Sequence, residues 1–226
     1  MEKKLKVKLI SYSKPSTEMY GEGLMDAQEL VAFCARVSNP SNQFNMDTAD
    51  KLIKYLIKHQ HWSPLEMVSA CLEIETTRDI ARQILRHRSF SFQEFSQRYA
   101  DPTKDLDFVL REARLQDHKN RQNSIQTDDA QLKVWWDAKQ KFIIDQVRSI
   151  YAEAIEKGIA KEQARVILPE GNTVSRLYMN GTIRSWIHYI QLRKENGTQE
   201  EHRDIALECA KAIAEAFPMV DDIVNN

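Results

Sequence analysis

The sequence predicts an α+β fold in a single domain over residues 1–226, with a small mixed sheet and several long helices. Short stretches with strand character are spread along the chain. Longer stretches whose apolar residues recur at helical spacing lie between and after them. A chain of 226 residues can bury a sizeable core, and no internal repeat, low-complexity tract or linker divides it. One α+β domain is the simplest interpretation.

The first hundred residues alternate between the two periodicities, and turn-forming or capping residues separate the elements. The predicted elements are a strand at 5–10, a helix at 26–37 that ends in the polar cluster 38–42, a helix that begins after Asp47 or Thr48 and ends near His59, a strand at 67–75, and a helix at 78–87 capped by Thr76 or Thr77.

The second half begins with a charged, glutamine- and asparagine-rich stretch at 101–131, which we interpret as a long excursion that is partly irregular or mobile. Five further elements are predicted after it. They are a long helix at 132–155, a helix at 160–168 stopped by Pro169, a short strand at 173–179, and closing helices at 183–192 and 202–217.

The composition restricts the possible functions. A formal net charge of -1 argues against a dedicated nucleic-acid-binding protein. Three isolated cysteines in apolar patterns (Cys34, Cys71 and Cys209) predict buried, reduced thiols in a cytoplasmic protein and no disulfide frame. No metal site is expected, because no metal-ligand spacing occurs. No stretch is long and apolar enough to predict a membrane span, so we expect a soluble protein.

Arg86, His87 and Arg88 stand in a row at the end of a predicted helix, and Ser96 follows after seven residues. Arginine suits bidentate capture of phosphate or carboxylate, so the row offers donors to anionic oxygens. Gln83 lies beside Arg86 on the predicted helix, which would bring both side chains to the same place.

This pattern resembles the signature of the flavin-dependent thymidylate synthases. Three other segments, 61–66, 165–169 and 184–193, also resemble segments of that family and occur in the family's order. The resemblance implies a homotetramer with flavin sites at subunit interfaces. The implied reaction is the reductive methylation of dUMP to dTMP, with methylenetetrahydrofolate as carbon donor, FAD reduced by NADPH as hydride carrier, and no cysteine nucleophile.

The resemblance also implies roles for individual residues. The flavin would contact Ser63, Arg86, His87, Arg88, Glu94, Arg184 and His188. The nucleotide would be held by Gln83, Arg86, Glu94, Ser96, Arg98, Arg165 and Arg193. His61 would lie at the folate or at the flavin face, and Arg193 would favour ionisation of the pyrimidine at N3. The segment before Arg184 is one residue longer than in some relatives, so contact with flavin stays open among Asn180, Gly181 and Thr182.

The residues alone leave other interpretations open. Arginines at 78, 82, 86, 88 and 98, with the phenylalanines at 90, 92 and 95, would also suit a nucleic-acid-binding module. A helical interaction protein without chemistry is a third class. Arg184 and His188 share a polar helix face that solvent alone could explain, and His61 could merely favour a helix dipole. Arg193 falls instead on the side of Trp186 and Ile190, where a purely solvated arginine is not expected.

Overall fold

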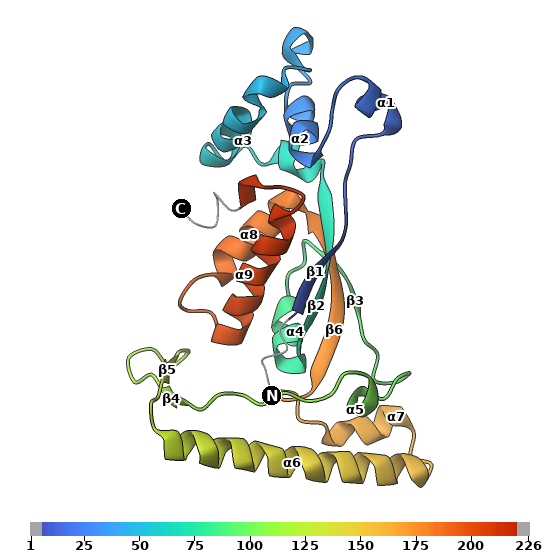
Figure 1. Ribbon diagram of the computed structural model, residues 1–226, viewed down its shortest axis with the longest axis vertical. Helices are drawn as coiled ribbons and strands as arrows, with labels where there is room; N and C mark the ends of the chain where they lie inside the picture. Colours follow the sequence, from blue (N-terminus) through green and yellow to red (C-terminus); the bar gives the residue numbers. More distant parts are fainter. Residues whose placement is uncertain (1–5, 221–226) are drawn as a thin grey trace.

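A four-stranded sheet forms the centre of the protein, in the order β1, β2, β6, β3. The computed structural model describes residues 6–220 (Figure 1). The strands are β1 (Lys6–Tyr12), β2 (Ser69–Thr77), β6 (Val174–Thr182) and β3 (Ser91–Glu94). The α+β class is confirmed. Residue 5 of the first predicted strand, and both ends of the predicted domain, lie outside the described residues.

All neighbouring strands in this sheet are antiparallel, so the predicted mixed sheet is wrong. The helices α8 (Ile183–Arg193) and α9 (Glu200–Ala214) pack against one side of the sheet (Figure 1). Parallel sheets need both faces covered, whereas an antiparallel sheet tolerates one open face. The strand β3 was not predicted, because it is short and lies at the sheet edge.

The main core lies between this sheet and the helices α8 and α9. Trp186 on α8 is fully buried, and its indole N–H donates to the carbonyl of Ala70 on β2 at 3.0 Å. The apolar side chains that surround it come from the central strands and both helices: Leu72, Ile74, Leu177, Met179, Ile190, Ile205, Cys209 and Ile213. The sheet therefore holds α8 rigidly, which matters for the residues at both ends of that helix.

The N-terminal helices lie at one end of the sheet (Figure 1). They are α1 (Thr17–Gly21), α2 (Ala27–Ala35) and α3 (Ala49–Lys58), with 3-10 turns at Pro40–Asn42 (η1), Met46–Thr48 (η2) and Ser63–Glu66 (η3). Asp26 caps α2 by accepting from the Glu29 amide at 2.8 Å. Thr48 is the N-cap residue of α3, as predicted, but its hydroxyl makes no capping bond.

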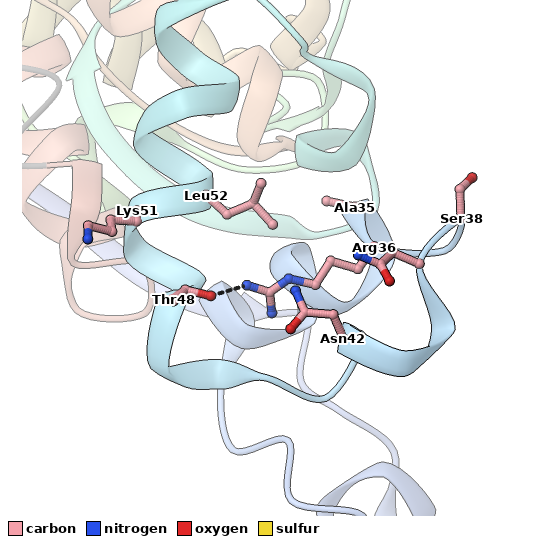
Figure 2. Close-up of a pocket in the computed structure, with 8 residues that line it drawn as sticks. Ala35, Arg36, Ser38, Asn42, Thr48, Lys51 and Leu52 are labelled. Atoms are coloured by element: carbon pink, nitrogen blue, oxygen red, sulfur yellow. Dashed lines mark hydrogen bonds between the residues drawn. The ribbon is translucent and has the colours of Figure 1, made fainter.

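A cavity of about 450 Å³ lies between α2 and α3, lined by Arg36, Ser38, Asn42, Thr48 and Lys51 among others. Arg36 donates to the Thr48 hydroxyl at 2.8 Å (Figure 2) and also to the carbonyl of Asn45. Its guanidinium is therefore used to hold the connection between the two helices. This explains why an arginine is buried at the edge of the fold.

The charged excursion is more ordered than predicted. It contains the short helix α5 (Pro102–Asp105) and a hairpin of β4 (Arg114–Gln116) and β5 (Ser124–Gln126). Gln126 donates to Glu200 on α9 at 3.0 Å, and Arg114 forms ion pairs with Glu200 and Glu201. Periodicity did not indicate these strands, because no alternating apolar face marks them. Ion pairs with α9 hold the hairpin in place instead.

The long helix α6 (Ala130–Glu156) lies at the end of the molecule opposite α2 and α3 (Figure 1). It packs with Phe108 and Leu168 in a smaller core. The helix predicted at 160–168 is confirmed only in part: α7 (Lys161–Ala164) makes one turn, and a 3-10 turn, η4 (Arg165–Ile167), continues it. Pro169 forces the residue before it out of helical geometry, and Leu168 is extended with ψ 123.

The remaining element boundaries differ modestly from the prediction. The helix after β2, α4 (Arg78–Ile84), ends three residues before His87, and β6 continues to Thr182. No helix within residues 6–220 is long and apolar enough to cross a lipid bilayer.

Candidate active site

The loop after α4, residues 86–90, runs beside α8. Residues in the first and the last turn of that helix hold it by hydrogen bonds. We call it the Arg-His-Arg loop. The hydroxyl of Ser185, in the first turn of α8, donates to the Ser89 carbonyl at 3.3 Å. Phe90 packs edge-on against Trp186 with ring centroids 4.8 Å apart. The guanidinium of Arg193, in the last turn of α8, donates through Nε to Nε2 of His87 at 3.0 Å. The helix thus fixes the loop along its whole length.

The contact between Arg193 and His87 defines the protonation state of the imidazole. An arginine can only donate, so Nε2 of His87 accepts and its proton sits on Nδ1. Burial, followed by the charges of Arg193 and Arg86, lowers the pKa of His87 to about 4. His87 is therefore neutral near pH 7. Arg193 is half-buried, as its position on the helix predicted, and faces this ring.

Gln83 lies in a buried polar cluster that the sequence did not single out. Its amide nitrogen donates to Gln199 Oε1 at 2.9 Å, and its Oε1 lies 3.1 Å from Nδ1 of His202. Nε2 of His202 lies 3.2 Å from the hydroxyl of Tyr189. Burial, then the charges of Arg193 and His87, lowers the pKa of His202 to about 3. The histidine that begins the predicted last helix and the two glutamates just before it were the available signal, and they resemble an ordinary helix start.

Glu94, at the end of β3, lies in a second group of charges. Its carboxylate accepts from the Ser175 hydroxyl at 2.8 Å and lies 3.6 Å from Arg78 and 3.8 Å from Arg82. Burial lowers the pKa of Arg78, and the charge of Glu94 opposes that shift. Arg78 is thus a buried structural partner, whereas Arg82 is half exposed.

Ser96, Arg98 and Arg165 form a third group, around Glu162 of α7. Arg98 pairs with the Glu162 carboxylate at 3.3 Å, and Arg165 donates to the Glu162 carbonyl at 3.3 Å. The hydroxyl of Ser96 accepts from the Arg98 amide at 3.3 Å. The nucleotide residues expected from the resemblance therefore fall into separate groups: one around Gln83, one around Glu94 and one around Glu162.

The expected flavin residues lie partly on α8 and partly on the turn η3. Arg184 forms an ion pair with Glu66 of η3. The exposed ring of His188 packs edge-on against Trp62, with centroids 4.5 Å apart. The partial desolvation of the ring, followed by the charge of Arg184, lowers the pKa of His188. Ser63, in the same turn, is exposed, so its hydroxyl is available to a ligand.

Arg86 and Arg88 are also exposed, so the Arg-His-Arg loop presents cations to solvent next to the first turn of α8. His61 lies beyond the end of α3, exposed, with its ring 5.9 Å from that of Tyr55. A position beyond the helix end weakens the interpretation of His61 as a helix-dipole partner. Loop, turn and helix together form a surface rich in donors that suits an anionic ligand.

The three residues before α8 now have distinguishable roles. A Cβ on Gly181 would lie 2.4 Å from a ring carbon of Phe90, so the glycine allows the Arg-His-Arg loop to approach β6. Thr182 caps α8 by accepting from the Ser185 amide at 3.3 Å. Asn180 is exposed and has no such structural role.

The cysteines differ from the expected burial. Cys209 is fully buried, but Cys34 and Cys71 are only half-buried, because they lie at the edge of α2 and on the less covered side of β2. Burial raises the pKa of all three thiols. None of them is therefore poised as a thiolate.

The chain matches the family described as thymidylate synthase complementing protein over residues 22–219. It is 50% identical over 216 residues to a probable flavin-dependent thymidylate synthase of Paramecium bursaria Chlorella virus 1, covering 96% of this chain and 97% of the relative. It is 51% identical over 214 residues to a flavin-dependent thymidylate synthase of Synechocystis sp., covering 95% and 96%. It also resembles the crystal structure of a UMP/dUMP methylase, PolB from Streptomyces cacaoi, bound with 5-Br dUMP. That match has 26% identity, a TM-score of 0.75, and coverage of 99% of this chain and 96% of that chain.

Proposed function

The chain belongs to the thymidylate synthase complementing protein family, and from this premise we propose that it is a flavin-dependent thymidylate synthase. The proposed reaction converts dUMP to dTMP with methylenetetrahydrofolate as carbon donor and NADPH as reductant. The observation that carries the proposal is the contact between Arg193 and His87, because it joins the end of α8 to the Arg-His-Arg loop that the family resemblance singles out.

The donor chemistry of the site suits FAD. The exposed guanidiniums of Arg86 and Arg88, the Ser63 hydroxyl and Arg184 offer charge-assisted hydrogen bonds to a pyrophosphate. His188 and Trp62 add aromatic surface beside them. When bound, the flavin would supply the hydride, while the protein orients the reactants and excludes water.

We assign Arg193 the role of stabilising negative charge on the pyrimidine at N3. Its Nε is used by His87, which leaves the terminal guanidinium nitrogens for a ligand. A fixed positive charge aimed at a developing anion lowers the barrier without rearrangement during the reaction. The neutral His87 adds no competing charge, so the field at the pyrimidine comes from the arginine.

The separation of the expected nucleotide residues supports a site completed by other copies of the chain. The group around Glu162 lies at α7, and the groups around Gln83 and Glu94 lie on α4 and β3. The long helix α6 also exposes apolar side chains whose burial a partner would favour. They are Val134, Trp135, Phe142, Ile143 and Ile150, which are 50 to 71% exposed. We propose a homotetramer; a cytoplasmic location stays a prediction.

Two measurements test the function. The purified protein should be yellow, with flavin absorption bands, and should release tritium from dUMP labelled at C5 in the presence of methylenetetrahydrofolate and NADPH. Arg193→Lys should keep the flavin but lose most turnover, because a point charge does not reproduce the planar fork. Arg121→Lys, an exposed arginine of the hairpin, is the matched control. A colourless protein, or near-parental turnover in Arg193→Lys, contradicts the corresponding assignment.

Oligomerisation has its own test. Trp135→Glu together with Phe142→Glu places two charges on the exposed face of α6, and light scattering then reports the mass of the particle. We expect a tetramer for the parent and a smaller species for the double variant, because buried unpaired charges oppose association. Lys119→Glu, at an exposed lysine of the hairpin and away from α6, controls for added charge. Equal masses for the parent and the double variant would remove α6 from the interface.

A further inference from the structure

The charged excursion holds a buried carboxylate beside the candidate site. Glu201, in the first turn of α9, accepts from Arg111 at 2.8 Å and from Arg114 at 2.5 Å. Burial alone would raise the pKa of Glu201, but the two arginines outweigh it and bring the pKa down to about 2. Arg111 is itself fixed by Asp79 at 2.8 Å and by the Gly171 carbonyl at 3.1 Å. Glu201 is therefore ionised near neutral pH and acts only as an acceptor.

This acceptor determines the orientation of the neighbouring amides. A carboxylate only accepts, so Gln199 must turn its amide nitrogen toward Glu201, at 3.0 Å. Its carbonyl oxygen then faces Gln83, which must donate with its own amide nitrogen at 2.9 Å. The oxygen of Gln83 is left to face His202 at 3.1 Å.

The series of hydrogen bonds continues into the core through His202 and Tyr189, and its donors keep the same direction. Since the oxygen of Gln83 accepts, Nδ1 of His202 must carry the proton. The neutral ring then accepts at Nε2 from the hydroxyl of Tyr189, at 3.2 Å. His202 is fully buried and Tyr189 is 1% exposed, so water does not compete for these bonds. Every donor from Tyr189 to Gln199 points toward Glu201.

We propose that Gln199, oriented by Glu201 between Arg111 and Arg114 of the excursion, is a positioning residue that fixes the amide of Gln83 for the nucleotide. The inference rests on the proposed function, in which Gln83 contacts dUMP. One amide hydrogen of Gln83 is not used by Gln199, and it is available to an oxygen of the nucleotide. A flipped amide would present its carbonyl to that oxygen and repel it, so orientation decides between attraction and repulsion.

The experiment measures dUMP affinity by calorimetry on the flavin-loaded protein, with KM and kcat beside it. Gln199→Met interrupts the series of hydrogen bonds, keeps the length of the side chain and buries no new charge. We expect the Kd and KM for dUMP to rise about two- to tenfold, the range for one hydrogen bond, with a smaller change in kcat. Gln126→Met is the matched control. Gln126 also donates to a glutamate of α9, but it does not belong to the series of hydrogen bonds from Tyr189 to Glu201.

A double-mutant cycle separates this inference from the proposed function. In the Gln83→Met background, Gln199→Met should have no further effect on dUMP affinity. If Gln83→Met itself leaves affinity unchanged, the proposed contact of Gln83 with the nucleotide is wrong. If Gln83→Met weakens binding but Gln199→Met matches the parent, or the two effects add, the positioning role is overturned while the contact stands.

A second variant covers the case in which Gln199→Met does not fold. Tyr189→Phe keeps the ring and removes the hydroxyl that donates to His202. It should raise the Kd for dUMP in the same direction, and this effect should also vanish in the Gln83→Met background. If Tyr189→Phe leaves the Kd for dUMP unchanged while Gln83→Met raises it, the positioning role is likewise overturned.

Discussion

Lowering the pH should destabilise the protein mainly through His202. The imidazole is fully buried, and burial together with the charges of Arg193 and His87 lowers its pKa to about 3, against 6.5 for the free side chain. Between these two values the unfolded chain binds a proton that the folded protein does not. The stability is therefore complete above pH 6.5 and decreases as the pH falls toward 3.

The magnitude follows from the two pKa values. Each pH unit in this window costs about 1.4 kcal/mol, so the free energy of unfolding should be about 2 to 3 kcal/mol lower at pH 4.5 than at pH 7. His87 acts in the same direction, because its pKa is lowered to about 4. That ring is only half-buried, so solvent screening reduces its share.

The assay is urea unfolding at pH 7.0 and 4.5, at one protein concentration because association would also stabilise the fold. His202→Gln removes the titrating group. The free energy of unfolding should therefore fall between the two pH values by about 2 to 3 kcal/mol less in this variant than in the parent. His118→Gln, an exposed histidine of the hairpin, should behave like the parent. Equal pH dependence in His202→Gln and the parent would refute the reasoning.

Three other changes give separate tests. Gly181→Ala should destabilise the fold by about 1 to 3 kcal/mol in thermal unfolding, because the new Cβ meets the buried ring of Phe90, whereas Gly197→Ala has open space and should cost less than about 0.5 kcal/mol. Arg88→Ala should fold normally but bind FAD more weakly by about tenfold in a fluorescence titration, as expected for a charge-assisted hydrogen bond. Retention of flavin at parental affinity would exclude Arg88 from the site. Replacing Cys34 and Cys71 by serine and Cys209 by alanine should leave tritium release from labelled dUMP intact, since burial raises the pKa of each thiol. Lost turnover in a folded, flavin-bound triple variant would contradict this.

The family resemblance singled out more of the candidate site residues than periodicity did. Periodicity placed Arg193 on the buried side of its helix, and the structure finds it half-buried against His87. The row Arg86 to Arg88 stood out by composition alone. In contrast, spacing could not tell Arg78, which is buried beside Glu94, from Arg82, which is half exposed one turn later.

The sequence by itself determined the α+β class, the central strands and the positions of the main helices, because those depend on apolar residues repeating within one element. Tertiary structure alone decided that the sheet is antiparallel, that the excursion forms a hairpin, and that Gln83 meets Gln199. Those two glutamines are 116 positions apart in the chain. A local pattern records which side of an element is buried, but it does not record which distant partner covers it. The partner is set only when the sheet packs against α8 and α9. In that arrangement Arg111 and Arg114, from a charged stretch without apolar periodicity, both contact Glu201 on α9.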